Sequence, residues 1–283
     1  MAGKLFVVAT PLGNLQDLSQ RAIETLRTVE RIACEDTRRT AGLLARWEIR
    51  TPTLSCHRFN ERERLDDVLS RLQAGERIAL VSDGGTPGIC DPGGLLIRAA
   101  REAGIPIEPV PGPCALSTLL SVSGLPADRF VFEGFLPHRA GERRRRLREL
   151  RSETRTVVFY EAPHRLAACL QDLAEIVGDR PLVLGRELTK VHETILCGSA
   201  GSLQEALGET VRGEITVALA GAPPGGAEAA TVEPEADRLL ACWRETLTRH
   251  DGSVRPALRE AARRLGLKRA ELYRRLNELG EPV

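Results

Sequence analysis

Short apolar runs alternate with longer stretches of helical periodicity along most of this chain, and this alternation restricts the fold more than any other feature. Leu5–Ala9, Ile78–Ser82 and Ile105–Val110 are compact apolar runs bounded by polar residues or glycine, as is typical of buried strands. Arg62–Leu72 and Leu95–Ala103 repeat apolar residues at helical spacing. Strands that alternate with helices predict βα units, with a parallel sheet under helices.

The same alternation begins again after the Pro111-Gly112-Pro113 segment, where His164–Val177 is the longest expected helix. The strands expected in this second half are Phe130–Phe135, Thr156–Tyr160, Leu182–Leu184, Thr194–Cys197 and Ile215–Leu219. A length of 283 residues also favours about two domains. We therefore expect the α/β class, with two α/β domains at residues 1–112 and 113–221.

The last part of the chain has a different composition. Residues 222–235 are rich in Ala, Gly, Pro and Glu without apolar periodicity, which predicts a linker. Residues 236–283 predict a small helical domain, in which a helix, Gly266 and a basic helix form a helix-turn-helix pattern. From Arg244 to Val283 there are ten Lys or Arg residues against six Asp or Glu. This tail is expected to dock on RNA, to bind DNA, or to pack on a second copy of the chain.

Composition excludes several classes of protein. The seven cysteines are scattered without a CxxC pair, which favours free thiols in a reducing compartment and no metal site. No apolar run approaches the length of a membrane span, and the first one is too short for a signal peptide. We therefore expect a cytoplasmic protein that does not enter a membrane. The net charge of +1 argues neither for nor against nucleic acid as a partner.

Three glycine-rich turns each follow an expected strand, at residues 9–15, 82–88 and 110–115. In open α/β sheets, ligands bind beyond the carboxyl ends of the strands, and glycines there allow backbone groups to approach a ligand closely. Asp83 adds a carboxylate suited to ribose hydroxyls or to an ammonium group. Neither GxGxxG nor a P-loop motif is present. The turns therefore predict a polar cofactor held mainly by backbone groups, unless they only end their strands.

Eight motifs in a fixed order resemble those of the ribosomal RNA small subunit methyltransferase I family, within the tetrapyrrole methylase (class III) methyltransferases. They are Thr10–Leu15, Glu35–Arg38, Ser82–Pro87, Asp91–Gly93, Val110–Ala115, Gly134–Pro137, Phe159–Arg165 and Arg186–Lys190. The resemblance extends from residue 4 to about residue 220, and the tail resembles the helical extension of the family. Two small departures are Gly84, where the family often has alanine, and Arg212, where it often has lysine.

The resemblance implies 2'-O-methylation of a cytidine in the decoding region of small-subunit (16S) ribosomal RNA, with S-adenosylmethionine as the methyl donor. It implies that the cofactor lies in a cleft between the two α/β domains, that the chain forms a homodimer, and that the small ribosomal subunit or its rRNA is the partner. The positions that would line the cofactor are Pro11, Leu12, Gly13, Asp83, Gly84, Gly85, Thr86, Gly112, Pro113, Cys114, Ala115 and Tyr160.

A ribose hydroxyl is a weak nucleophile, so the reaction needs a base or a group that stabilises the forming alkoxide. Glu35, Asp36 and Lys190 are the catalytic candidates at the ends of expected strands. Asp36 could instead be a helix N-cap. Lys190 could be a base, an electrostatic stabiliser or a solvated surface lysine. Further acidic or basic groups at strand ends are Glu161, His164, Glu187 and Glu193.

The segment Arg139–Arg151 contains seven arginines against two glutamates. At its centre are Arg143, Arg144, Arg145 and Arg146. Consecutive arginines repel one another unless anions are near, so we expect contact with RNA phosphates, with a solvated helix face as the alternative. Arg38 and Arg165 are further expected RNA contacts.

Two other functions remain open from the sequence. One keeps the fold but methylates a tetrapyrrole or another small molecule, which the arginine-rich segment and the basic tail disfavour. The other is a ligand-sensing regulator that binds duplex DNA through its tail and catalyses nothing.

Overall fold

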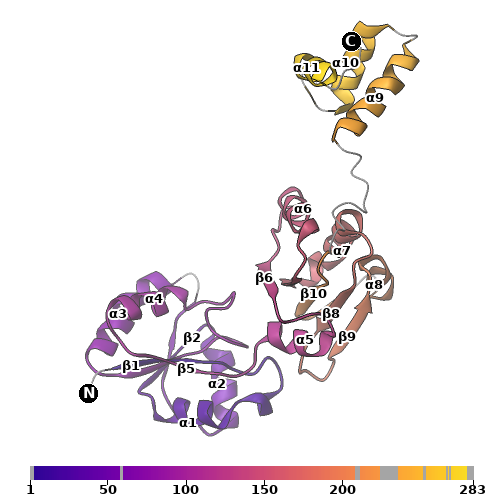
Figure 1. Cartoon of the computed structure of the whole chain (residues 1–283). Coiled ribbons are helices and arrows are strands. Elements are labelled where there is room, and N and C mark those ends of the chain that lie inside the picture. Colours follow the sequence, from indigo (N-terminus) through magenta and orange to yellow (C-terminus); the bar gives the residue numbers. More distant parts are fainter. Residues whose placement is uncertain are drawn as a thin grey trace. The chain divides into compact units, whose positions relative to one another are not determined.

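The computed structural model describes residues 3–57, 60–207, 211–223, 235–250, 253–265, 267 and 269–278. It divides into two compact units, Met1–Ala222 and Pro223–Val283. The first unit contains two β-sheets with their helices, and the second consists of helices (Figure 1). This architecture confirms the expected α/β class with a small helical region at the end of the chain.

The first sheet is entirely parallel, as the alternating pattern predicts. Its strand order is β3-β2-β4-β1-β5. The strands are β1 (Lys4–Val8), β2 (Arg31–Cys34), β3 (Thr53–Ser55), β4 (Arg77–Leu80) and β5 (Ile107–Val110). Since all five run in one direction, every loop that follows a strand emerges at the same edge of the sheet.

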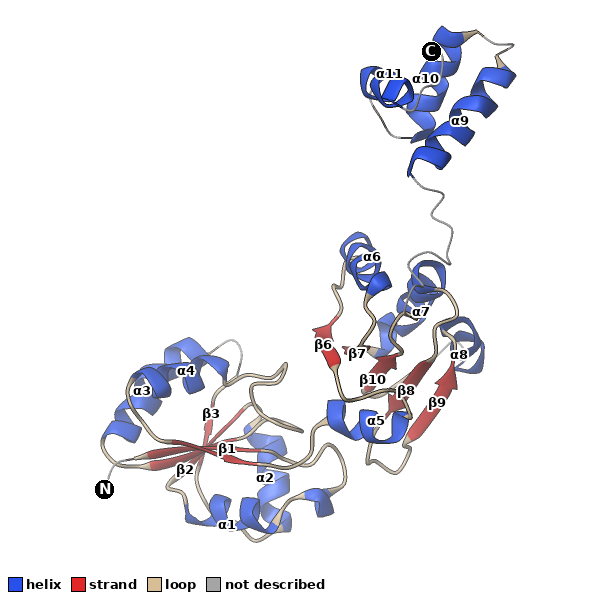
Figure 2. Cartoon of the chain, in the orientation of Figure 1, coloured by secondary structure: helices blue, strands red, loops and turns tan. Residues whose placement is uncertain are grey.

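Two pairs of helices cover the two faces of this sheet (Figure 2). After the short 3-10 helix Leu15–Asp17, α1 (Gln20–Thr28) and α2 (Thr37–Arg46) pack on one face, and α3 (Glu61–Gln73) and α4 (Gly94–Glu102) pack on the other. The apolar residues of each helix recur every three or four positions, so they form one buried stripe against the strands.

A buried carboxylate fixes the start of α4. Oε1 of Glu61 accepts hydrogen bonds from the backbone N–H groups of Gly93, Leu95 and Leu96, at 3.1, 3.0 and 3.2 Å. These are donors that the first turn of a helix cannot satisfy internally. Gly93 itself has a φ of 116°, and a Cβ on it would lie 2.6 Å from Cδ2 of Leu80. Glu61 therefore anchors the loop between β4 and α4.

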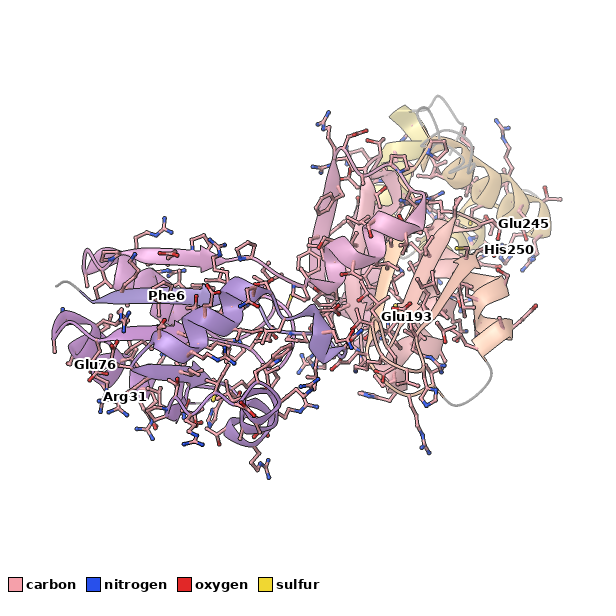
Figure 3. All side chains as sticks on the ribbon, turned by 90° about the horizontal axis from the view of Figure 1, so that it is seen from below. Phe6, Arg31, Glu76, Glu193, Glu245 and His250 are labelled. Atoms are coloured by element: carbon pink, nitrogen blue, oxygen red, sulfur yellow. The ribbon has the colours of Figure 1, made fainter. Side chains whose placement is uncertain are left out.

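Ion pairs occupy the amino-terminal edge of the first sheet. Arg31 at the start of β2 lies 3.2 Å from Glu76, which precedes β4, and Figure 3 shows the two side chains together. Both are partly exposed, so the pair adds little to stability.

The second sheet is mixed, with strand order β6-β7-β10-β8-β9. Its strands are β6 (Phe130–Phe135), β7 (Thr156–Glu161), β8 (Leu182–Arg186), β9 (Thr194–Gly198) and β10 (Ile215–Leu219). Only β6 and β7 are parallel; the other neighbours are antiparallel. The connection from β8 to β9, residues 187–193, is too short for the crossover that parallel neighbours need.

Helix α5 (Ala115–Ser123) packs on one face of the second sheet. The other face is covered by α6 (Ala140–Glu149), the short 3-10 helix Leu150–Ser152, α7 (Pro163–Val177) and α8 (Ala200–Leu207). Buried residues of β7, β8 and β10 face both layers, so these central strands are apolar along most of their length.

The second unit contains α9 (Glu235–Arg249), α10 (Val254–Leu265) and α11 (Arg269–Glu278), packed around the fully buried Trp243. Helices α10 and α11 flank Gly266, which lies outside the described residues, so the expected helix-turn-helix pattern stays a prediction. Of the expected linker, residues 224–234 lie outside the described part of the chain. None of the described helices combines the length and the apolar character needed to cross a bilayer.

Candidate functional site

Two of the glycine-rich turns are joined directly at the carboxyl edge of the first sheet. Thr10, which follows β1, exchanges two backbone hydrogen bonds with Gly85, which follows β4, at 2.8 and 2.9 Å. The hydroxyl of Thr10 also donates to the carbonyl oxygen of Ser82, at 3.0 Å. Gly85 has a φ of 91°, a conformation that residues with a side chain rarely adopt. The two turns therefore form one rigid floor.

A cavity of about 560 Å³ opens above this floor. That volume lies within the range of about 300–1,000 Å³ that is common for ligand pockets. Residues of both sheets line it: Leu12, Glu35, Arg39, Asp83, Gly84, Gly85, Thr86, Ile89, Cys90, Asp91, Cys114, Ala115, Phe135, Tyr160, Glu161, Ala162, Pro163, Lys190, Gly213, Glu214, Ile215 and Thr216.

Most of the positions expected around the cofactor line this cavity. They are Leu12, Asp83, Gly84, Gly85, Thr86, Cys114, Ala115 and Tyr160. The other four lie beside it: Pro11, Gly13, Gly112 and Pro113. The Pro113 carbonyl accepts a hydrogen bond from the Thr86 hydroxyl at 3.1 Å, and a Cβ on Gly112 would lie 3.0 Å from that of Ala9. Pro113 thus links its turn to the turn after β4, and Gly112 allows its turn to approach Ala9 closely.

Asp83 connects the glycine-rich turn after β4 with the residues that follow β2. Its Oδ1 accepts a hydrogen bond from the backbone N–H of Asp36 at 3.0 Å, and its Oδ2 lies 3.3 Å from Nη1 of Arg39. The carboxylate is thus oriented by its neighbours while it also lines the cavity. Arg39, one turn into α2, was not among the expected site residues.

Two other carboxyl groups that line the cavity, those of Glu35 and Asp91, have shifted pKa values. Burial, followed by the charge of Asp83, raises the pKa of Glu35, although His57 and Arg39 partly oppose this shift. Burial raises the pKa of Asp91 to about 6, against a hydrogen bond with Ser82 and with the charges of Glu35 and Asp83 adding to the rise. Asp91 belongs to a motif that the sequence marks, but its role as a cavity residue was not expected.

Lys190 reaches the cavity from the loop between β8 and β9. Its Nζ lies 2.8 Å from Oε1 of Glu187 and 3.0 Å from Oε2 of Glu214. Burial opposes the charged ammonium, but the hydrogen bonds to these two carboxylates outweigh burial and raise the pKa of Lys190. The two carboxylates therefore favour the charged form of the lysine. In this arrangement its ammonium is placed to stabilise negative charge.

The loop that carries Lys190 has an unusual backbone. Glu187 and Thr189 have φ values of 52° and 66°, which are uncommon for residues other than glycine. The loop is held by Glu193, whose carboxylate accepts the N–H of Thr189 at 2.6 Å, and by the Thr189 hydroxyl, which accepts the N–H of Asn14 at 3.1 Å. Such backbone strain persists only where surrounding contacts fix it, and it is frequent at functional sites.

Asp36, the third catalytic candidate, is the N-cap of α2. Its Oδ1 accepts the N–H of Arg38 at 2.8 Å, and its Oδ2 pairs with the Arg38 guanidinium at 3.1 Å. These contacts lower the pKa of Asp36 to about 2. Its side chain is not among those lining the cavity. The Arg38 side chain is 90% exposed.

Aromatic rings form the wall on the side of the second sheet. The Tyr160 ring meets Phe132 and Phe135 edge to face, with centroids 5.1 and 5.6 Å apart. Burial raises the pKa of Tyr160. Phe135 is about half exposed although it lines the cavity. This wall offers an apolar surface to a flat ring.

Arg165, on α7, contacts the ends of β6 and β7 in the second sheet. Its guanidinium pairs with the buried Glu161 at 3.0 Å and donates to the carbonyl oxygen of Leu136 at 2.6 Å. The side chain is 18% exposed. His164 beside it is exposed, and its side chain is not among those lining the cavity.

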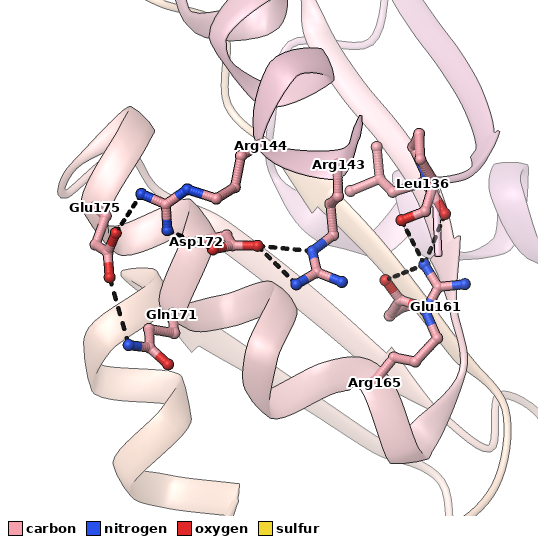
Figure 4. Close-up of polar contacts among 9 residues, drawn as sticks. Leu136, Arg143, Arg144, Glu161, Arg165, Gln171, Asp172 and Glu175 are labelled. Carbon is pink, nitrogen blue, oxygen red and sulfur yellow. Dashed lines mark hydrogen bonds and ion pairs between the residues drawn. The ribbon is translucent and has the colours of Figure 1, made fainter. Parts of the chain in front are cut away.

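Three of the four consecutive arginines form ion pairs within the chain, and Figure 4 shows those of Arg143 and Arg144. Arg143 is buried against Asp172 at 2.7 Å, and Arg144 pairs with Asp172 and Glu175 at 2.8 and 2.6 Å. Arg146 pairs with Glu133 at 2.6 Å and with Glu149 at 2.7 Å. Arg145 is exposed, and no carboxylate of the described residues pairs with it. The run of arginines therefore links α6 to α7 and β6, while the Arg145 side chain remains in solvent.

The chain is similar to known proteins in sequence and in fold. Residues 4–204 match the family described as Tetrapyrrole (Corrin/Porphyrin) Methylases. Proteins named Ribosomal RNA small subunit methyltransferase I are similar to the chain. The one from Xylella fastidiosa is 51% identical over 87% of this chain and 90% of its own length, and the one from Synechocystis sp. is 45% identical over 98% of both. The one from Thermotoga maritima is 45% identical over 99% of its own length but only 77% of this chain.

Solved structures share the fold at low sequence identity. Diphthine synthase has a TM-score of 0.62 at 15% identity, covering 77% of this chain and 90% of that one. Uroporphyrin-III C-methyltransferase from Thermus thermophilus, in complex with S-adenosylhomocysteine, has a TM-score of 0.55 at 18% identity, covering 76% and 97%.

Proposed function

The chain belongs to the ribosomal RNA small subunit methyltransferase I family of the tetrapyrrole methylases, and we propose that it methylates the 2'-hydroxyl of a cytidine in small-subunit ribosomal RNA. It is a methyltransferase that uses S-adenosylmethionine. The observation that carries the proposal is the cavity where a rigid glycine-rich floor meets several carboxylates and one protonated lysine.

The lining of the cavity suits this cofactor. Glu35, Asp83 and Asp91 give one side of the cavity an acidic character that favours a ligand with ammonium and sulfonium charges. Gly84 and Gly85 expose backbone groups at the same place, and a Cβ on Gly84 would lie 3.2 Å from the carbonyl oxygen of Pro11. Leu12, Ile89 and the aromatic wall leave an apolar part for a purine ring.

The residues around the cavity divide the catalytic work. When bound, S-adenosylmethionine supplies an electrophilic methyl group on a sulfonium centre. Lys190 keeps its proton and stabilises the negative charge that develops on the attacking ribose oxygen. Glu35, whose pKa is raised by burial, accepts the hydroxyl proton. Asp36 contributes through its backbone N–H, which orients Asp83.

We place the contacts with RNA phosphates at exposed arginines of the first unit. Arg38 and Arg145 present their guanidinium groups to solvent. The other arginines expected to touch RNA, Arg143, Arg144, Arg146 and Arg165, pair with carboxylates of the chain and would orient their surroundings. Since ribosomal RNA is the substrate, we propose that the enzyme works in the cytoplasm.

The proposal includes a homodimer. It is supported by exposed apolar side chains at α5 and β6, where Val122 and Phe130 are 54% and 41% exposed. Exposed apolar side chains gain free energy when another protein surface covers them. Light scattering coupled to size-exclusion chromatography would measure the mass in solution, and a single-chain mass would contradict the dimer.

One experiment tests the activity itself. The purified protein is incubated with tritiated S-adenosylmethionine and either small ribosomal subunits or naked small-subunit rRNA, and the RNA is then digested with alkali. Label in alkali-resistant dinucleotides is expected, because a methylated 2'-hydroxyl cannot assist strand cleavage. Label only in mononucleotides would show base methylation instead. If neither the small subunits nor the naked rRNA is labelled although the protein binds the cofactor, the proposal is refuted.

A further inference from the structure

A second hollow of about 910 Å³ adjoins the first cavity. It is lined by Gly13, Asn14, Leu15, Gln16, Arg46, Glu187, Thr189, Lys190, Val191 and His192. Lys190 lines both hollows, and the turn after β1 places Leu12 in the first and Gly13 in the second. The two hollows therefore meet at the lysine.

The rim of this second hollow is fixed from both sides. The Thr189 hydroxyl accepts the N–H of Asn14 at 3.1 Å, so the β8–β9 loop is tied to the turn after β1. The Asn14 side chain accepts the N–H of Gln16 at 3.1 Å and shapes the second half of that turn. Because the shape of the groove is already fixed, binding a flexible ligand does not cost the free energy of ordering the protein loops.

The groove offers the groups that bind single-stranded nucleic acid. Val191 at the tip of the loop is 96% exposed and Leu15 is 39% exposed, which leaves two apolar contacts for a sugar or a base. Gln16 adds an amide on the same rim. Arg46 is exposed and stacks over the Trp47 ring at 5.3 Å, and no carboxylate of the described residues pairs with it. Its guanidinium is therefore available for a phosphate.

The acidic residue of the groove does not repel a phosphate strongly. Glu187 shares the Lys190 ammonium at 2.8 Å and accepts the N–H of Glu214 at 2.9 Å. The hydrogen bond from Lys190 lowers the pKa of Glu187, and the ammonium, which Glu214 shares, offsets part of its charge. The first cavity, in contrast, has three carboxylates near its floor, which suits a cation. The two hollows thus differ in the charge of the ligand that they favour.

We propose that this groove, formed by residues 13–16, 187 and 189–192 with Arg46, binds the nucleotides of single-stranded RNA that adjoin the methylated one. The proposal rests on the proposed methylation of rRNA and assigns the path of the strand. Lys190 stands where the target ribose passes from the groove into the methyl-donor cavity. Arg46 contacts a flanking phosphate, while Val191 and Leu15 pack against a flanking sugar or base.

Site-specific photocrosslinking tests the path of the strand. Val191 is replaced by p-benzoylphenylalanine in the full chain, and Arg101, exposed on α4 and outside both hollows, receives the same replacement as a control. After irradiation with the RNA substrate, crosslinks are mapped by primer extension, and the methylated nucleotide is mapped in the same RNA. Position 191 should crosslink within a few nucleotides of the methylated one, and position 101 should not.

The outcomes separate this inference from the proposed function. If the RNA is methylated but crosslinks from position 191 are absent or remote from the methylated nucleotide, the groove does not hold the strand and the methyltransferase assignment stands. If the unmodified enzyme methylates no RNA, the proposed function fails and the path of the strand fails with it.

Substitutions in the groove supply a second readout. Arg46→Ser should raise the KM for RNA, by on the order of fivefold for loss of one phosphate contact at low salt. Val191→Ser should also raise this KM, through loss of an apolar contact with a sugar or base. The dissociation constant for S-adenosylmethionine should not change, because neither residue lines the first cavity. Arg101→Ser is the matched control and should leave both constants unchanged. Equal KM values for Arg46→Ser and Arg101→Ser would contradict the groove.

Discussion

The side chain of Lys190 lies directly over Gly13: a Cβ built on Gly13 would be 2.1 Å from Cγ of Lys190 and 3.0 Å from its Cδ and Cε. The glycine therefore leaves the space that the lysine stem occupies on its way to Glu187 and Glu214. Here the absence of a side chain on one residue determines the position of a charge carried by a residue far along the chain.

Gly13→Ala should displace the Lys190 ammonium and slow methyl transfer. Loss of one preorganised electrostatic group typically lowers kcat by about 10²-fold or more, so we expect a fall of at least tenfold. The dissociation constant for S-adenosylmethionine should change little. The matched control is Gly42→Ala in α2, where nothing lies within 4 Å of the new Cβ. Equal kcat values for the two variants would show that the position of Lys190 is unimportant.

Arg143→Met should destabilise the fold because it leaves Asp172 as a buried carboxylate with a weaker set of partners. Both side chains of the pair are less than a tenth exposed. Removing one partner of a buried ion pair costs about 3–5 kcal/mol, although Arg144 also contacts Asp172 and will reduce the loss. Urea unfolding followed by circular dichroism measures the change. A free energy of unfolding equal to that of the unsubstituted protein would refute the structural role.

Arg145→Ser should leave stability within about 0.5 kcal/mol and weaken RNA binding. If Arg145 contacts a phosphate, the slope of log K against log salt should fall by about one unit. Filter binding at several salt concentrations measures this slope. Substitution of all four arginines would combine this effect with loss of the buried pair, so only the single variant isolates the contact with RNA.

The pH dependence of cofactor binding should follow Asp91. Its pKa of about 6 without ligand means that it becomes ionised as the pH rises through 6. A cationic ligand favours the ionised form, so affinity for S-adenosylmethionine should increase from pH 5 to pH 7 and then level off. Isothermal titration calorimetry across this range should show the increase in the unsubstituted protein. Asp91→Asn should bind more weakly at pH 7 and lose the increase.

The same carboxyl group should affect stability with the opposite dependence on pH. Since its pKa is raised from 3.8, the folded chain holds the proton more tightly than the unfolded chain does. Its contribution to stability is therefore largest below pH 3.8 and is lost as the pH rises to about 6. Asp91→Asn should raise the melting temperature at pH 8. A lower melting temperature would contradict burial as the cause of the shift.

Glu61→Ala should destabilise the first unit because it leaves three N–H groups at the start of α4 without their acceptor. A loss of about 1–3 kcal/mol is expected for unsatisfied buried donors. Glu61→Gln retains an acceptor oxygen and should lose less. Thermal unfolding of the two variants checks the order, and an equal loss would indicate that the negative charge matters more than hydrogen bonding.

Sequence periodicity predicts the regular elements well where apolar runs are strong. The expected Phe130–Phe135 and Ile215–Leu219 strands agree with β6 and β10 to the residue. Helix α5 was not predicted, because serine and threonine obscure its apolar face, and α2 was foreseen only as the alternative in which Asp36 is a helix N-cap. The antiparallel pairing in the second sheet was also not predicted, since alternation alone does not specify strand direction.

For the candidate site, too, the sequence indicates some features and misses others. The glycine-rich turns are local features, so the sequence could indicate them. Arg39 reaches Asp83 across 44 positions, and Asp91 has its shifted pKa because it lies near Glu35 and Asp83. Whether each of the four arginines forms an ion pair within the chain depends on whether Asp172 and Glu133 face α6. These relationships arise from the packing of separate elements, which periodicity cannot reveal.

The helical unit after Ala222 has a hydrophobic core built from its own three helices. A gene could therefore acquire or lose this segment in one event without compensating substitutions elsewhere. The relative from Thermotoga maritima, almost wholly matched by about three quarters of this chain, has the length that such a loss would leave. The helical core and the cores of the two sheets can therefore change in sequence independently, because they share no buried residue.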